Sequence, residues 1–218
     1  MSRRGVVVTL AVIALLAIAQ TVAHLVVVLD AGRIGTIVDL DRSNGLPDIV
    51  STLALALATV GAGLVAWWGT GGRTPAAGGL AAVLAVLTLA DILHDGAHPR
   101  SPDGAYVIGF VVVAGVLLAL VGRSCAPRTR ATLVAAGATL VCSFLVTGLD
   151  RVNHWFERAR GDPIAEYQIV AKEGLELVGW SLVALGLWDE ALRRRRRSTG
   201  LATATASRAP AASRRRAS

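Results

Sequence analysis

Six long apolar stretches dominate the 218-residue chain and limit the folds that it can adopt. A helix needs about 20 apolar residues to cross roughly 30 Å of hydrocarbon. None of the six shows the alternation of apolar and polar residues that a membrane-barrel strand requires. We therefore predict an all-α fold, a polytopic transmembrane bundle of six helices. The predicted spans cover about residues 5–29, 49–69, 78–95, 105–122, 131–150 and 168–188.

The composition agrees with this interpretation. Apolar residues make up 54% of the chain and charged residues 17%, against about 45–50% and 25% in soluble domains. These values exclude a disordered chain, a soluble nucleic-acid binder and a disulfide-stapled secreted domain. The two cysteines, Cys125 in a loop and Cys142 inside a span, lie at different depths, so we expect both to be free thiols.

The net charge of +7 comes from the C-terminal segment, because residues 193–218 hold nine arginines and no acid, and the remainder carries a net −2. We predict that residues 1–192 form the transmembrane domain and that residues 193–218 form a disordered tail on anionic lipid headgroups of the bilayer. No nucleic-acid partner is expected, and protein partners remain open. Arginines also dominate every second loop, so the positive-inside rule places both termini in the cytoplasm.

The first span has an alternative interpretation as a cleaved signal peptide. Ala17-Ile18-Ala19 resembles a signal-peptidase site, but the apolar run continues to Val28, which is too long for a typical signal. We therefore expect this span to be retained. Cleavage would leave five spans with the same orientation.

Ionisable residues gather at the outer ends of four spans, where burial makes each one a candidate for function. At the end of the third span, four of them follow at i, i+3, i+4 and i+7, and the fifth and sixth spans add further acids and a histidine. The candidate metal ligands are Asp91, His94, Asp95, Asp150, His154, Glu173 and Glu176, with His24, His98 and Lys172 as secondary candidates.

Carboxylate and imidazole groups from facing helices are the ligands of bundle metal sites, with a preference for Zn²⁺, Fe²⁺ or Mn²⁺. Glu173 or Glu176 is the candidate general base. A proton or ion-pair network and a wet interface are the alternatives. His24 is more simply a hydrogen-bonded bundle residue and His98 a loop residue, and Lys172 is expected to neutralise Glu176 or an acid of another helix.

Several short motifs resemble a group of uncharacterised bacterial multi-pass membrane proteins. The run Asp39-Leu40-Asp41…Asn44…Leu46-Pro47…Ser51 is similar to their first outer loop, Asp91 and His94-Asp95 to their middle-span motif, and Glu173-Gly174-Leu175-Glu176 to their last span. The middle-span motif of this sequence differs from that of the group, because it has one Asp three residues before the His and not an Asp-Glu pair further upstream. The resemblance implies a functional site formed by these residues, but no particular reaction. It also implies a location in the bacterial plasma (inner) membrane.

Membrane-embedded hydrolases of the alkaline ceramidase and adiponectin-receptor type also hold zinc with His and Asp from several spans. Their seven spans and defined serine have no counterpart in this sequence, where Thr88 and Ser143 are only nominal candidates for that serine.

Three functions follow. The first is an outward-facing metal site that binds a divalent ion and hydrolyses a lipid or periplasmic substrate. The second is a proton- or cation-coupled carrier, which the apolar inner halves of the spans disfavour. The third is a non-catalytic partner or sensor subunit. Whether the protein is an enzyme stays open at this stage.

Overall fold

The computed structural model describes residues 46–69, 74–94, 104–155 and 163–208, together with separate positions between Gly5 and Val22. Every regular element in this part is an α-helix. The helices are α2 (Leu46–Trp67), α3 (Thr74–His94), α4 (Gly104–Arg123), α5 (Pro127–Trp155) and α6 (Pro163–Arg208). The predicted all-α class is therefore confirmed, and the described helices include each of the predicted spans from 49–69 onward except Asp95 and the turn residues 68–69.

Proline fixes where several of these helices begin. Pro127 and Pro163 are the first residues of α5 and α6, and Pro75 is the second residue of α3. The first turn tolerates proline because its N–H groups have no intrahelical acceptor. The tight α4–α5 turn is closed by backbone hydrogen bonds from Ser124 N to Val121 O at 2.9 Å and from Cys125 N to Gly122 O at 3.1 Å.

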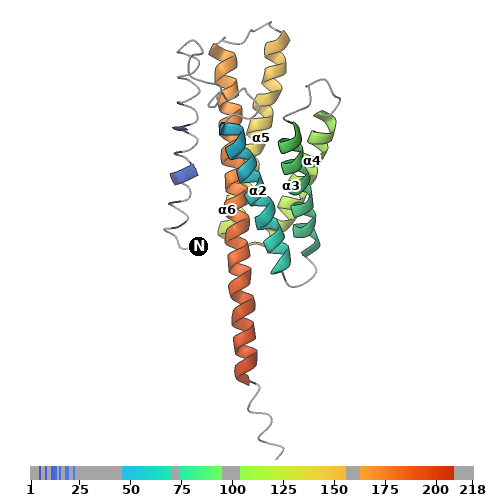
Figure 1. Ribbon diagram of the computed structural model, residues 1–218, viewed down its shortest axis with the longest axis vertical. Coiled ribbons are helices and arrows are strands. Elements are labelled where there is room, and N and C mark those ends of the chain that lie inside the picture. Colours follow the sequence, from blue (N-terminus) through green and yellow to red (C-terminus); the bar gives the residue numbers. More distant parts are fainter. Residues whose placement is uncertain are drawn as a thin grey trace, which may run out of the picture.

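The helices form an up-and-down bundle in which α6 packs against both α2 and α5 (Figure 1). Helix α3 packs on α2 and α4, whereas α4 touches α5 only sparsely. We call the end that holds Trp155 and Pro163 the upper end, and the end that holds Arg123 and Pro127 the lower end. Figure 1 shows α5 and α6 extending beyond α2, α3 and α4 at the upper end.

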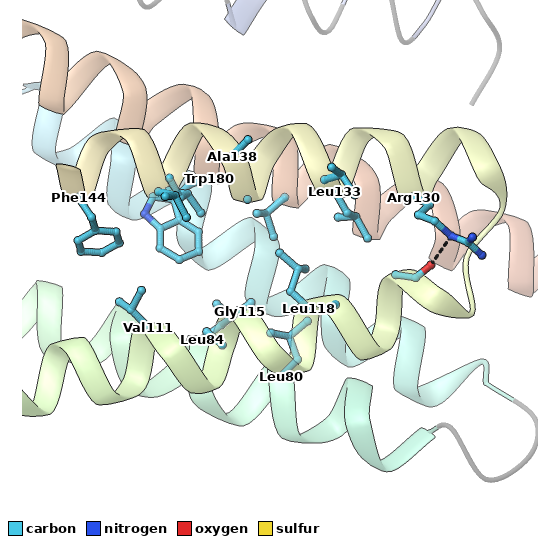
Figure 2. A pocket seen from close by; sticks show the side chains of 18 of the residues that line it. Leu80, Leu84, Val111, Gly115, Leu118, Arg130, Leu133, Ala138, Phe144 and Trp180 are labelled. Atoms are coloured by element: carbon cyan, nitrogen blue, oxygen red, sulfur yellow. Dashed lines mark hydrogen bonds between the residues drawn. The ribbon is translucent and has the colours of Figure 1, made fainter. Parts of the chain in front are cut away.

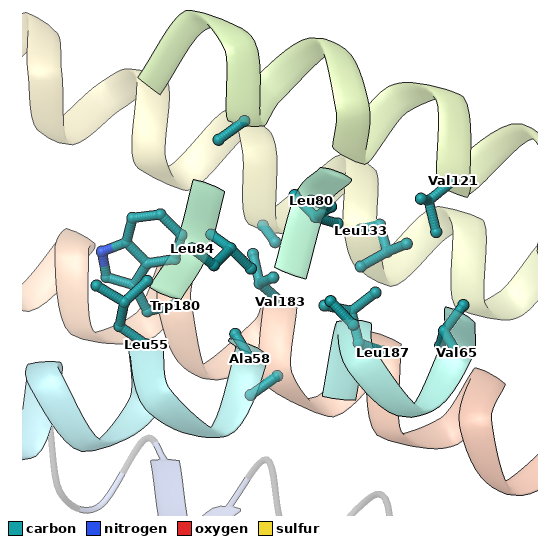
Figure 3. Packing of buried hydrophobic residues seen from close by; sticks show 14 of the residues in the cluster. Leu55, Ala58, Val65, Leu80, Leu84, Val121, Leu133, Trp180, Val183 and Leu187 are labelled. Carbon is teal, nitrogen blue, oxygen red and sulfur yellow. The ribbon is translucent and has the colours of Figure 1, made fainter. Parts of the chain in front are cut away.

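The core combines alanines with leucine and valine side chains. Ala58, Ala62 and Ala136 are fully buried, as are Leu187 and Val65, and Figure 3 shows Ala58, Val65 and Leu187 in this cluster. Gly61, Gly179 and Gly186 let helices approach closely, since an added Cβ would lie 3.0 Å or less from a side chain of the facing helix. Packing through small residues is typical of helix pairs in membranes.

Two described helical segments, Ile49–Trp67 and Pro127–Val146, are long and apolar enough to cross a membrane. Pro75–Ala90 and Val111–Arg123 are shorter apolar helical segments. The described positions between Gly5 and Val22 are helical, within the predicted span 5–29.

Helix α6 continues to Arg208, whereas the sequence predicts disorder from residue 193 onward. Two features explain the difference. Arginine and alanine have high helix propensity, and Arg193 and Arg194 both bond to Glu190 one turn earlier, which supports the helix at the point where the apolar residues end. Residues 209–218 lie outside the described part.

Candidate functional site

The alignment of α5 and α6 fixes the depth of most candidate residues. Near the upper end Ser143 Oγ donates to Lys172 O at 3.1 Å, and near the lower end Thr129 Oγ1 donates to Asp189 Oδ2 at 3.3 Å. The helices run antiparallel, so these two contacts set one consistent register along the pair. Glu173 therefore lies at the level of Ser143.

This register separates two groups that the sequence analysis places at one depth. Asp150 and His154 are seven and eleven residues beyond Ser143 on α5, or roughly 10 and 16 Å farther toward the upper end at 1.5 Å per residue. The backbones of Asp150 and His154 therefore lie nearer the upper end than those of Glu173 and Glu176, and the side chains of Asp150 and His154 lie outside the described part.

Helix α3 brings the other half of the predicted site to the level of the glutamates. Leu84 lies beside Trp180 of α6 (Figure 3), and Leu80 and Val183 line the same cavity one turn below. These helices are antiparallel, so seven residues toward the upper end from Leu84 and Trp180 lead to Asp91 and Glu173. The backbone of Asp91 thus lies at the depth of Glu173. By the same count, at 1.5 Å per residue, His94 lies roughly 9 Å nearer the upper end than Glu176.

The described side chains at this level are polar and partly shielded. Lys172 Nζ lies 2.9 Å from Glu173 Oε1, with the two side chains 38% and 18% exposed. The sequence predicts Glu176 or an acid of another helix as the lysine partner, and the structure shows a contact with the adjacent Glu173. Glu176 is half-buried and has its own polar contact.

The remaining candidate ligands cannot be placed in the same way. Asp95, His24 and His98 lie outside the described residues, as do the side chains of Asp91 and His94. Among the residues that the structure describes, no three His, Cys, Asp or Glu side chains come together as a metal site would require. The predicted ligand set therefore stays a prediction.

Ser51 is a residue of this level that the search for ionisable groups missed. Its side chain is only 9% exposed, and its Oγ has no hydrogen-bond partner among the residues that the structure describes. Leu55, one turn below on α2, lies beside Trp180 (Figure 3), and α2 runs parallel to α6, so Ser51 is level with Glu176. A buried hydroxyl without a partner costs about 1–3 kcal/mol, so this position can accept a ligand or water that offers a hydrogen bond.

The lower end holds a second polar group, built around Glu190. Its side chain is 0% exposed and accepts from Arg193 Nε at 2.9 Å and from Arg194 Nε at 2.8 Å. Arg194 also donates to Val65 O at 3.2 Å and to Ser124 Oγ at 3.3 Å. Glu190 thus ties α6 to α2 and to the α4–α5 turn. The i+3 and i+4 spacing of the two arginines is the sequence signal that could have revealed it.

Cys125, in the α4–α5 turn, is buried beside this group. Burial, followed by the negative charge of Glu190, raises the pKa of its thiol from 9.0 to about 11, against the opposing charges of Arg194, Arg193 and Arg130. Both Cys125 and the exposed Cys142 are free thiols, as the sequence predicts.

We expect Cys125 to react with maleimide about 100-fold more slowly than an ordinary thiol below pH 9, because two pH units separate 9.0 from 11 and the thiolate is the nucleophile. The rate should rise about tenfold per pH unit up to pH 11. Labelling kinetics on a Cys142→Ser background measures this, with detergent-denatured protein as the control. A rate equal to that of the denatured protein at pH 8 would contradict the burial.

Comparison with known proteins finds no matching protein family, no similar curated protein and no similar solved structure.

Proposed function

We propose that this chain is a multi-pass integral membrane protein of the bacterial inner membrane, and that its upper end binds a divalent metal ion on the outer side. The exposed apolar surface of the bundle supports the membrane part. Large aliphatic side chains such as Leu53, Val112 and Leu145 are exposed. Soluble monomers rarely expose apolar patches of this extent.

Charge supports an orientation with both termini in the cytoplasm. Arg123, Arg128 and Arg130 lie at the lower end, and the arginines that begin at Arg193 continue α6 from it. Arg195 lies 5.6 Å from the ring of Trp68, an arrangement suited to the headgroup region. By the positive-inside rule, the lower end faces the cytoplasm and the upper end faces outward.

For the metal ion we propose Asp91 and His94 of α3 with Glu173 and Glu176 of α6 as the ligand set. The common depth of Asp91 and Glu173, each one turn from another of the four residues, is the observation that supports this proposal. Carboxylate and imidazole ligands suit Zn²⁺, Fe²⁺ or Mn²⁺, and such an ion lowers the pKa of a bound water so that it can attack a lipid or periplasmic substrate. Glu173, which contacts Lys172, or Glu176 would serve as the general base.

The Lys172–Glu173 ion pair also favours a second candidate, a proton- or cation-coupled carrier in which the same acids titrate. A carrier needs a polar path across the bundle. Between Trp180 and Leu187, however, the buried α6 side chains are all apolar: Val183, Ala184, Leu185 and Leu187. The metal site is therefore the better-supported proposal.

Single substitutions at the four proposed ligands separate these functions. We expect Asp91→Asn, His94→Ala, Glu173→Gln and Glu176→Gln each to lower metal occupancy at least about tenfold, since loss of one ligand costs 10-fold or more in affinity. Asp150→Asn is the matched control and should retain the ion, because Asp150 is an acid of α5 outside the proposed ligand set. Occupancy is read by metal titration of purified protein.

A carrier would give a different pattern, with pH-dependent flux lost and bound ion unchanged. A partner subunit would tolerate all four substitutions. Either pattern would contradict the metal site.

A further inference from the structure

A long apolar groove lies between α4 and α5, on the side of the bundle where those two helices barely touch. Its volume is about 630 Å³ (Figure 2). Leu84 and Trp180 form part of its floor. Along its walls stand Val111, Gly115, Leu118, Leu133, Ala138 and Phe144, and none of the residues that line the groove is acidic.

Two glycines keep this groove open. A Cβ added at Gly115 of α4 or at Gly137 of α5 would meet no atom within 4 Å. Elsewhere in the bundle glycines serve the opposite purpose, since Gly179 and Gly186 are in close contact with α5. The space at Gly115 and Gly137 is therefore not used for packing between the described helices.

Arginines stand at the lower end of the groove and only there. Arg130 Nε donates to Gly122 O at 3.2 Å (Figure 2), and one terminal nitrogen donates to Arg123 O at 3.0 Å. These bonds hold the guanidinium at the mouth of the groove, where Arg123 is also exposed. Guanidinium groups bind phosphate oxygens strongly and in a defined geometry.

The length of the groove suits one acyl chain. Arg130 and Phe144 are fourteen residues apart on α5, or roughly 21 Å at 1.5 Å per residue. One leaflet of a bilayer has a hydrocarbon depth of about 15 Å. A chain that enters from the lower surface would fill the groove while its headgroup stays beside the arginines.

We propose that this groove binds one anionic phospholipid of the cytoplasmic leaflet, with its phosphate on Arg123 and Arg130 and an acyl chain between α4 and α5. The proposal rests on the membrane insertion and orientation given above and is independent of the metal ion. The positive charge at the mouth and the uncharged interior match the two parts of such a lipid.

The test is native mass spectrometry of the full chain released from nanodiscs of mixed phosphatidylglycerol and phosphatidylcholine. The wild type should retain one phosphatidylglycerol in preference to phosphatidylcholine. Gly137→Leu places a side chain in the groove and should reduce the retained lipid about tenfold. Gly63→Leu is the matched control, because Gly63 also has open space around its Cβ but lies on α2, outside the groove.

A second pair of variants tests the headgroup. Arg123→Gln with Arg130→Gln should abolish the preference for phosphatidylglycerol while a chain is still bound. Equal lipid retention in Gly137→Leu and Gly63→Leu would overturn the proposal, as would a wild type without headgroup preference. Carbonate extraction distinguishes failure of the lipid site from failure of membrane insertion. A chain that stays in the membrane but retains no lipid refutes only the lipid site. A chain that carbonate releases refutes membrane insertion.

Discussion

Replacing Glu190 with glutamine is expected to lower the free energy of unfolding by about 2 kcal/mol, because Arg193 and Arg194 then lose the carboxylate that neutralises them. Glu190 is fully buried, whereas the two arginines are 26% and 15% exposed. A completely buried pair would cost about 3–5 kcal/mol, and the remaining access of the arginines to water reduces that value.

Thermal unfolding in detergent measures this effect. Arg196→Gln is the control, because Arg196 is exposed on the same helix. Its replacement changes the net charge by one unit in the opposite direction. Arg194→Gln should destabilise less than Glu190→Gln, since Glu190 would keep Arg193 as a partner. An unchanged unfolding midpoint in Glu190→Gln would show that the buried group does not hold the lower end together.

The second large effect is expected at Gly179, where α6 approaches α5 most closely. A Cβ at this position would lie 2.6 Å from both Cγ and Cδ2 of Leu140 and 3.4 Å from its backbone nitrogen. We expect Gly179→Val to cost about 3 kcal/mol, at the upper end of the range for overpacking, because the backbone behind Leu140 limits relaxation.

Gly174→Val is the matched control on the same helix, since a Cβ there meets no atom within 4 Å. A Leu140→Ala substitution should partly restore the stability of Gly179→Val, because it removes the atoms that clash. If Gly174→Val and Gly179→Val unfold at the same temperature, the close approach of α5 and α6 is not a determinant of stability.

Much of the helical architecture follows from local sequence. Apolar runs of span length predict α2 and α4 closely, and Pro127 and Pro163 mark helix starts. The continuation of α6 to Arg208 was missed because hydrophobic periodicity ends before Arg193. What maintains the helix there is a set of ion pairs to Glu190, and nothing in the apolar pattern reveals that this acid is buried.

The sequence could predict which residues are candidates for the site, but not which of them lie close together. Burial cost points to the acids and histidines at the upper end. Which of them share a depth depends on register, and register depends on contacts between distant residues, such as Ser143 with Lys172 and Leu84 beside Trp180. The hydroxyl of Ser51, which has no partner among the described residues, was missed for the same reason. A serine in a sequence indicates a site only once its burial is known.

The most direct test of the proposed metal site is the metal content of the detergent-purified protein, measured by elemental mass spectrometry without exposure to chelators. We expect close to one divalent ion per chain in the wild type, retained in Asp150→Asn and lost in a double variant with His94→Ala and Glu176→Ala. An ion-free wild type, or a double variant that keeps its ion, would contradict a metal centre between α3 and α6.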